Sequence, residues 1–233
     1  MPLNFALIIF ELVVMVLSIS LHDCAQAWLA NRLGDPTARM LGRMTMNPAR
    51  HFDLFGMVIS PLLCIFVFTN SLLLGWGKPV PTTYRNFSRK DGEMLAVLAG
   101  PAAQLLAAVV CLIAMIVLKH TNAAVPESLR IVAAMARFRL PLPTTGLTPL
   151  FPLLLLLYTG ILMNLFLAVF NLVPIPFLDG GRILIHFLPF NAAKAFERYS
   201  LYIMIAFFFI GFPLVMMVFG PLLGVFNVML ALL

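Results

Sequence analysis

Charged residues are scarce in this sequence. Asp, Glu, Lys and Arg make up 10% of the 233 residues and apolar residues 62%, against about 25% and roughly 45–50% in soluble domains. The mean hydropathy is +1.04. These values exclude a water-soluble globular domain and indicate a protein that lies in the lipid bilayer with several membrane spans.

Cysteine is also rare, and its pattern does not suggest a disulfide framework. Cys24, Cys64 and Cys111 lie in apolar segments and show no Cys-x-x-Cys spacing, so we interpret them as small buried thiols. The fifteen Lys and Arg are divided among the loops between apolar stretches. This distribution is typical of membrane loops, and it argues against nucleic acid as a partner.

Five apolar stretches reach or approach the roughly 20 residues that cross a hydrocarbon core. They cover residues 4–30, 54–76, 94–118, 150–173 and 200–233. The first lacks the basic region and cleavage site of a signal peptide, so we expect it to remain as a membrane helix. The last contains Gly211 and Pro213 and forms either one kinked helix or two helices. We therefore expect an all-α polytopic membrane protein with about six transmembrane helices.

The loops on either side of the second stretch favour short β-strands at the membrane surface. Residues 34–53 show partial period-2 alternation, and Pro79 and Pro81 place the next loop in an extended context. The sequence therefore predicts strands between helices 1 and 2 and between helices 2 and 3. If every span crosses, the basic groups divide evenly between the two sides, so charge does not decide the orientation.

Ionisable residues inside the spans are the candidates for chemistry, because each costs several kcal/mol unless it is paired or faces a cavity. His22 and Gln26 are four residues apart and share one face of a helix. The segment around them, HDCAQ, is close to HExxH, in which two histidines bind zinc and a glutamate is the general base. Asp23 is one methylene shorter than glutamate, and Gln26 offers only a neutral amide, so the pattern alone also fits a polar helix face without a metal.

A second candidate group follows the fourth stretch, in NLVPIPFLDGGR at 171–182. Its prolines and glycines break the helix at membrane depth, which is tolerated where backbone lines a cavity. Asp179 then projects from irregular backbone as a candidate ligand, or it caps the next helix from an ordinary Asp-Gly turn. His51, before the second stretch, is a further candidate, although it also fits a plain helix start.

Read in order, these motifs resemble the site-2 protease family of intramembrane zinc metalloproteases (peptidase M50), in the compact bacterial form without a PDZ domain. The similar segments are SLHDCAQAW, LGDPTARMLGRMTMNPARHFDLFG, GWGKPVPTTYRNF, LAGPAAQLLAA and NLFLAVFNLVPIPFLDGGRIL. They cover most of residues 15–185. The resemblance implies a single transmembrane domain over 1–233, with 200–233 as a C-terminal helical segment.

The resemblance also implies the roles of individual residues. His22 and Asp179 match the zinc ligands of the family, Asp23 takes the place of the catalytic glutamate, and Gln26 takes the place of the second histidine. Asn171 matches a family asparagine that could bind the substrate backbone, and His51 is a possible additional ligand. One Zn²⁺ is expected if the site is intact.

Three functions therefore stay open at this point. The first is an intramembrane zinc metalloendopeptidase, attenuated or not, that hydrolyses peptide bonds in the transmembrane segments of a partner protein. The second is a catalytically inactive pseudoprotease that binds such segments without cleavage. The third is a transporter or scaffold, or a chain whose site was altered deliberately. The compact bacterial form implies a multi-pass protein of the bacterial cytoplasmic membrane.

Overall fold

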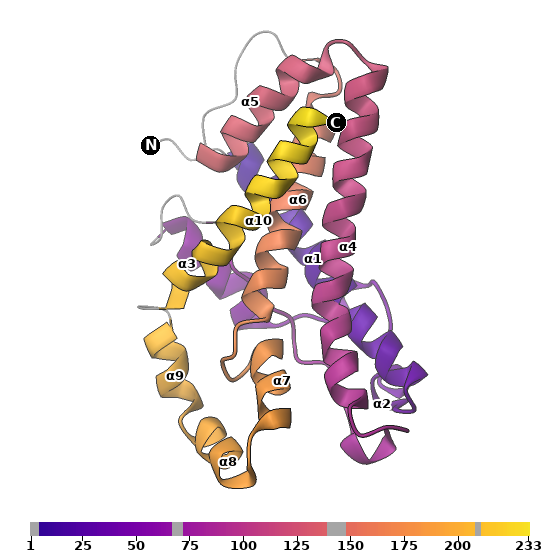
Figure 1. The fold of residues 1–233 in the computed structure, drawn as a ribbon, viewed down its shortest axis with the longest axis vertical. Coiled ribbons are helices and arrows are strands. Elements are labelled where there is room, and N and C mark those ends of the chain that lie inside the picture. The colour runs from indigo at the N-terminus through magenta and orange to yellow at the C-terminus, as the bar shows by residue number, and fades with distance from the viewer. Residues whose placement is uncertain (1–4, 67–71, 139–147, 208–210) are drawn as a thin grey trace.

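The structure, a computed structural model, describes residues 5–66, 72–138, 148–207 and 211–233. Within these ranges the regular structure is helical (Figure 1). The α-helices are α1 (Phe5–Arg32), α2 (Thr37–Met40), α3 (Ser60–Phe66), α4 (Gly92–Thr121), α5 (Val125–Phe138), α6 (Phe151–Asn171), α7 (Asp179–Phe187), α8 (Phe190–Arg198), α9 (Ser200–Ala206) and α10 (Phe212–Leu232). Single 3₁₀ turns occur at η1 (Pro48–Arg50) and η3 (Tyr84–Asn86), and a π-helical turn, η2 (Phe55–Ile59), precedes α3.

Helices α1, α4, α6 and α10 are, among the described residues, the ones long and apolar enough to cross a membrane. The 21 residues of α6 extend for about 31 Å at 1.5 Å per residue, which matches a hydrocarbon core. Helix α6 lies at the centre and packs against α1, α4, α5 and α10. The predicted all-α polytopic membrane fold is confirmed, whereas the predicted count of about six spans is not.

The second apolar stretch turns back on itself instead of crossing. The hydroxyl of Ser60 in α3 donates to the carbonyl of Leu74 at 2.9 Å, and the Lys78 N–H donates to the carbonyl of His51 at 3.0 Å, so the two ends of the stretch meet. The close approach depends on Gly56, where an added Cβ would lie 2.1 Å from the Trp76 carbonyl oxygen. The described parts of 54–76, on either side of residues 67–71, therefore lie against each other, which corrects the expectation of a single span there.

The surface segments 33–54 and 72–91 contain no β-strand in the structure as described, which corrects the expectation of strands there. Four prolines remove the N–H groups that a ladder would need: Pro36, Pro48, Pro79 and Pro81. The buried carboxylate of Asp35 joins the segments instead, accepting hydrogen bonds from the Thr83 N–H (2.7 Å) and the Asn86 amide (2.9 Å). Burial alone would raise the pKa of Asp35, but the hydrogen bonds from Thr37, Asn86 and Thr83 hold this pKa below its ordinary value.

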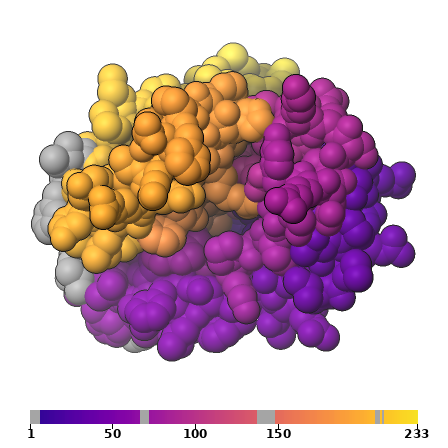
Figure 2. Space-filling view, turned by 90° about the horizontal axis from the view of Figure 1, so that it is seen from below, coloured from indigo at the N-terminus to yellow at the C-terminus, as the bar shows by residue number. Residues whose placement is uncertain are grey.

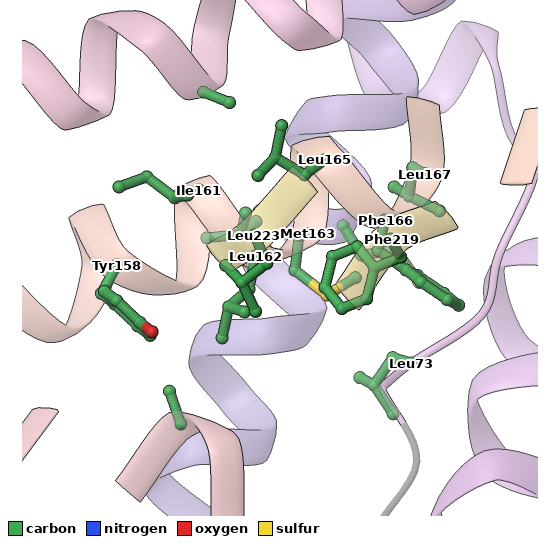
Figure 3. Close-up of a cluster of buried hydrophobic side chains, with 14 of the residues drawn as sticks. Leu73, Tyr158, Ile161, Leu162, Met163, Leu165, Phe166, Leu167, Phe219 and Leu223 are labelled. Atoms are coloured by element: carbon green, nitrogen blue, oxygen red, sulfur yellow. The ribbon is translucent and has the colours of Figure 1, made fainter. Parts of the chain in front are cut away.

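Apolar side chains of α6 and α10 fill the centre of the bundle (Figure 3). The Phe166 ring meets the Phe219 ring edge-on, with centroids 5.6 Å apart, a favoured arrangement for aromatic pairs. Tyr158 is buried, and its hydroxyl donates to the Asn227 side chain at 2.9 Å. This contact supplies the partner that a phenol needs inside an apolar core.

Three neutral polar side chains form a second buried feature, which we call the neutral cluster. The Ser18 hydroxyl of α1 donates to Asn164 Oδ1 of α6 at 2.8 Å, and the Gln104 amide of α4 donates to the Ser18 oxygen at 3.0 Å. The Asn164 amide group donates to the Gly160 carbonyl at 2.8 Å. These bonds fix the three central helices against one another, because leaving such groups unpaired in an apolar interior costs free energy.

Candidate active site

Helix α1 carries the first part of the site on one buried face. His22, Asp23 and Gln26 are each at most 6% exposed, and the i, i+4 spacing stacks His22 and Gln26 one turn apart. Helix α4 lies directly against the imidazole, since a Cβ added at Gly100 would come within 2.4 Å of His22 Nε2. Only glycine at this position lets the two helices enclose the ring so closely.

The turn 172–178 carries the second part of the site. Helix α6 ends at Asn171, and Pro174 and Pro176 prevent its continuation. Gly181 then allows α7 to begin against this turn, because an added Cβ would lie 2.0 Å from the Ile175 carbonyl oxygen. Asp179, the first residue of α7, is thereby brought to the face of α1, 153 residues from Gln26 in the chain.

The side chains of His22 and Asp179 approach each other closely, yet one nitrogen of the imidazole makes no hydrogen bond among the described residues. His22 Nε2 lies 2.7 Å from Asp179 Oδ2, yet in the described part of the protein this buried nitrogen has no partner with hydrogen-bond geometry. His22 Nδ1 lies 3.1 Å from Asp23 Oδ1. A histidine whose Nδ1–H donates to a carboxylate presents Nε2 as a free electron pair, which is the usual arrangement of a metal-binding imidazole.

Gln26 donates hydrogen bonds at the position where the sequence pattern predicts a metal ligand. Its amide nitrogen donates to Asp179 Oδ2 at 2.7 Å and to the carbonyl of Val97 at 3.2 Å. The side chain therefore neutralises part of the negative charge of Asp179 by hydrogen bonding. An amide held in this way faces Asp179 with N–H groups, and a cation requires an oxygen or an unprotonated nitrogen.

Asp23 is the centre of a network that reaches the surface segments. Its Oδ2 lies 3.1 Å from His51 Nδ1 and 3.3 Å from Arg43 Nη2, while Oδ1 faces His22. His51 Nε2 lies 2.8 Å from the carbonyl of Thr45, so both ring nitrogens of His51 are engaged away from Asp179. The idea that His51 is an additional metal ligand stays a prediction, and in this arrangement it binds the carboxylate of Asp23. We use the name charged cluster for six residues: His22, Asp23, Gln26, Arg43, His51 and Asp179.

A pocket of about 40 Å³ opens beside the charged cluster. Its lining includes His22, Asp23, Gln26, Asn171 and Asp179, so these predicted site residues meet at one place, while His51 lies behind Asp23. Trp76, Gly77, Pro79 and Val80 line another side, and Arg182, whose Nη2 lies 3.3 Å from Glu93 Oε1, also lines the pocket. Figure 2 views this end of the molecule and shows a recess between the orange segment with α7 and α8 and the purple and magenta segments.

Sequence reasoning missed several residues that build the site. Arg43 binds Asp23, Gly100 admits the ring of His22, and the carbonyl of Val97 binds Gln26. Arg43 and Gly100 belong to two of the segments that resemble the family. The sequence therefore contains a signal for these positions, but it does not indicate which residues they contact. Phe177, whose φ of 77° is the positive one among described non-glycine residues, gave no signal at all.

Comparison with known proteins places the chain in a family. Residues 10–211 match Peptidase family M50. The chain belongs to peptidase family M50. It is 31% identical over 181 residues to a Bacillus subtilis (strain 168) protein named "Putative zinc metalloprotease YwhC", and the match covers 77% of this chain and 69% of that protein. No solved structure matches. The resemblance to site-2 proteases is thus confirmed, and M50 membership supports a peptidase of the site-2 type.

Zinc is the metal of M50 peptidases, and two residues of the chain fit it. His22 Nε2 and Asp179 Oδ2 converge at 2.7 Å without a hydrogen bond from the imidazole. Ligand distances of about 2.0–2.2 Å and a tetrahedral angle require about 3.4 Å between the two atoms, so they need to separate by about 0.7 Å. Catalytic zinc usually has three protein ligands, and no group of three His, Cys, Asp or Glu side chains arranged for a metal is found among the described residues.

Proposed function

We propose that this M50 member is an intramembrane zinc metalloprotease with attenuated activity, which hydrolyses peptide bonds within transmembrane segments of a partner membrane protein. The observation that carries the proposal is the buried His22 Nε2, which lies 2.7 Å from Asp179 Oδ2 but makes no hydrogen bond among the described residues. Two metal-donor atoms in such close contact are stabilised by a cation between them. Gln26 would have to turn its amide oxygen inward to serve as the third, weak ligand.

The residues of the chain have distinct tasks in this proposal. His22 and Asp179 hold the zinc, which when bound supplies a Lewis acid and lowers the pKa of water toward 7. Asp23 is the carboxylate available as general base, but its oxygens already face His22, His51 and Arg43. A base must release such partners to accept a proton from water, so we expect Asp23 to act slowly.

Substrate binding falls to the walls of the site pocket. A transmembrane helix has its carbonyls hydrogen-bonded internally, so the substrate must unwind before cleavage. The backbone groups of Trp76, Gly77 and Val80, which line the pocket on either side of the internally bonded Lys78, can offer single hydrogen bonds to such an unwound segment, in place of the strands expected from sequence. Asn171 also lines the pocket, and its side-chain amide is suited to hold a substrate carbonyl.

A second function, a pseudoprotease that binds segments without cleaving them, is favoured by one specific contact. The Gln26 amide donates to Asp179 Oδ2 at 2.7 Å, which replaces a metal bond by a hydrogen bond. In this alternative the pocket still receives an unwound segment, but Asp179 and His22 are held by protein donors alone.

One experiment separates the two functions. Zinc per purified chain, and cleavage of a model transmembrane substrate, are measured for this sequence and for the Asp23→Glu, Gln26→His double variant, with Asp179→Ala in the double variant as the metal-free control. We expect weak zinc binding by the unchanged chain, and about one zinc per chain with faster cleavage after restoration. Stoichiometric zinc and cleavage without restoration rule out the pseudoprotease, and absence of zinc from both forms rules out the protease. A transporter would show stabilisation by a solute and no cleavage.

The folding back of the second apolar stretch also bears on orientation. Because the stretch 54–76 does not cross, the loops around it lie at the same end of the bundle as α7 and α8 (Figure 1). Eleven of the fifteen Lys and Arg belong to this site end, namely Arg32, Arg39, Arg43, Arg50, Lys78, Arg85, Arg89, Lys90, Arg182, Lys194 and Arg198. The positive-inside rule then favours a cytoplasmic position for the site end, in a multi-pass protein of the cytoplasmic membrane.

A further inference from the structure

Phe177 combines features that the fold itself does not explain. It stands between Pro176 and Leu178 with a φ of 77°, a left-handed conformation that disfavours residues with a Cβ, and aromatic ones in particular. Glycine or asparagine would adopt it at lower cost. The side chain is nevertheless a large apolar ring with 66% of its surface exposed.

Burial does not compensate the strain at Phe177. Its neighbour Leu178 is 6% exposed and packs into the core, whereas the ring of Phe177 points outward. Strained backbone persists where the surrounding structure fixes it, and such residues gather at binding and catalytic sites. The gain that offsets the strain is therefore to be sought in contacts outside the folded chain.

The position of Phe177 indicates which contacts these are. Phe177 lines the site pocket together with His22, Gln26 and Asp179. The same turn borders an apolar cavity of about 620 Å³ whose lining includes Leu172, Val173, Pro174 and Ile175 and residues of α9 and α10. Phe177 thus lies in the turn that joins a polar pocket to an apolar cavity large enough for several aliphatic side chains.

We infer that Phe177 is a specificity-determining residue that packs on an apolar side chain of the unwound substrate segment, next to the bond held in the site pocket. This inference deepens the proposed function and rests on its substrate class, an apolar transmembrane segment. It does not require cleavage, because packing on Phe177 precedes any reaction. The strained backbone of the turn places an aromatic ring beside the pocket. Substrate binding then covers this ring.

The first test is photo-crosslinking in the full-length chain reconstituted in vesicles. Benzoylphenylalanine replaces Phe177 or, as matched control, Phe190, which is 80% exposed on α8 and lines neither cavity. The probe is a biotinylated Leu/Ala transmembrane peptide with a central Asn-Pro pair, compared with the same peptide without that pair. We expect at least fivefold more crosslinking of the Asn-Pro peptide from position 177 than from position 190. Equal yields from the two positions, or crosslinks from 177 to lipid alone, overturn the inference.

The second test measures strain and binding together. Phe177→Gly removes the ring and the backbone strain, so we expect its unfolding midpoint to rise by a few degrees while retention of the Asn-Pro peptide falls at least fivefold. Phe177→Tyr keeps the ring and should retain the peptide, and Phe190→Ala should leave retention unchanged. A lower midpoint for Phe177→Gly would mean that the ring stabilises the fold, and normal retention would mean that it does not contact the substrate. Either result contradicts the inference, and neither depends on whether the restored double variant cleaves.

Discussion

Two buried polar clusters lie one turn apart along α1, and they differ in how their charge and hydrogen bonds are arranged. The neutral cluster around Ser18 joins three helices by hydrogen bonds among uncharged groups. The charged cluster around His22 gathers two carboxylates, an arginine and two histidines at the edge of a pocket. Each cluster leaves a buried atom without a hydrogen bond among the described residues, Gln104 Oε1 in the neutral cluster and His22 Nε2 in the charged cluster, but the charged cluster borders the site pocket and combines opposite charges. Polar residues one turn apart on α1 thus join helices at one level and line a pocket at the next.

The largest expected effect breaks the charged cluster without changing any of its side chains. Gly181→Ala places a Cβ 2.0 Å from the Ile175 carbonyl oxygen, and backbone cannot yield as a flexible side chain does. We expect a loss of about 3 kcal/mol or more in the free energy of unfolding, together with loss of zinc binding.

The control for Gly181 is Gly224→Ala in α10, where nothing lies within 4 Å of the added Cβ. Removing a glycine from a helix interior should stabilise by roughly 0.5–1 kcal/mol. Unfolding in mixed micelles with increasing denaturing detergent measures both variants. A Gly181→Ala protein as stable as the unchanged chain would contradict the packing described for the turn 172–178.

Gly100→Ala separates metal binding from assembly. Its Cβ would lie 2.4 Å from His22 Nε2, so the ring must rotate or α4 must move away. Displacing a ligand from its supporting contacts typically weakens metal affinity by about 10- to 100-fold, and we expect that range for zinc. Zinc titration of the Gln26→His form with and without Gly100→Ala gives the measurement. Unchanged affinity would show that His22 does not hold the metal in the orientation seen here.

Ser18→Ala tests the opposite side of the comparison. It removes the hydroxyl that connects Gln104 with Asn164 and leaves buried amides unpaired, which costs about 1–3 kcal/mol. Zinc affinity should stay within a factor of two. Ser20→Ala is the matched control, because the hydrogen bond that the Ser20 hydroxyl makes within the described structure goes to the Val16 carbonyl of its own helix. A large loss of zinc affinity in Ser18→Ala would show that the two clusters are energetically coupled, which contradicts the distinction between them.

The smallest expected effect concerns Asp35, which lies outside both clusters. Its pKa is held below the ordinary value by hydrogen bonds from Thr37, Asn86 and Thr83, so the ionised form stabilises the fold above the unfolded pKa of about 3.9. That stabilisation is lost as the pH falls through the lower pKa of the folded state. Asp35→Asn should therefore be less stable at pH 7 and should show a weaker loss of stability on acidification below about pH 4. Identical pH profiles for the two proteins would contradict this role.

Much of the fold follows from apolar length alone. The stretches 4–30, 94–118 and 150–173 became α1, α4 and α6, because about 20 apolar residues satisfy their backbone only as a helix in lipid. The stretch 54–76 has the same composition, yet it folds back, since Gly56 and Gly75 let its two arms touch. Composition does not reveal that contact, which is why the sequence alone predicts a span over 54–76.

The sequence by itself determined the membrane class of this protein, the family, and the short set of buried polar residues. An uncompensated polar group is so costly in an apolar chain that each one requires a reason. Only the tertiary structure decided that Asp179 meets His22 and that Gln26 donates to Asp179, while Asp23 is held by His51 and Arg43. These contacts depend on the close approach of helices and turns distant in sequence, at Gly100 and Gly181. The residue types determine which groups are available to bind a metal or a proton, and packing determines which partner each of them has.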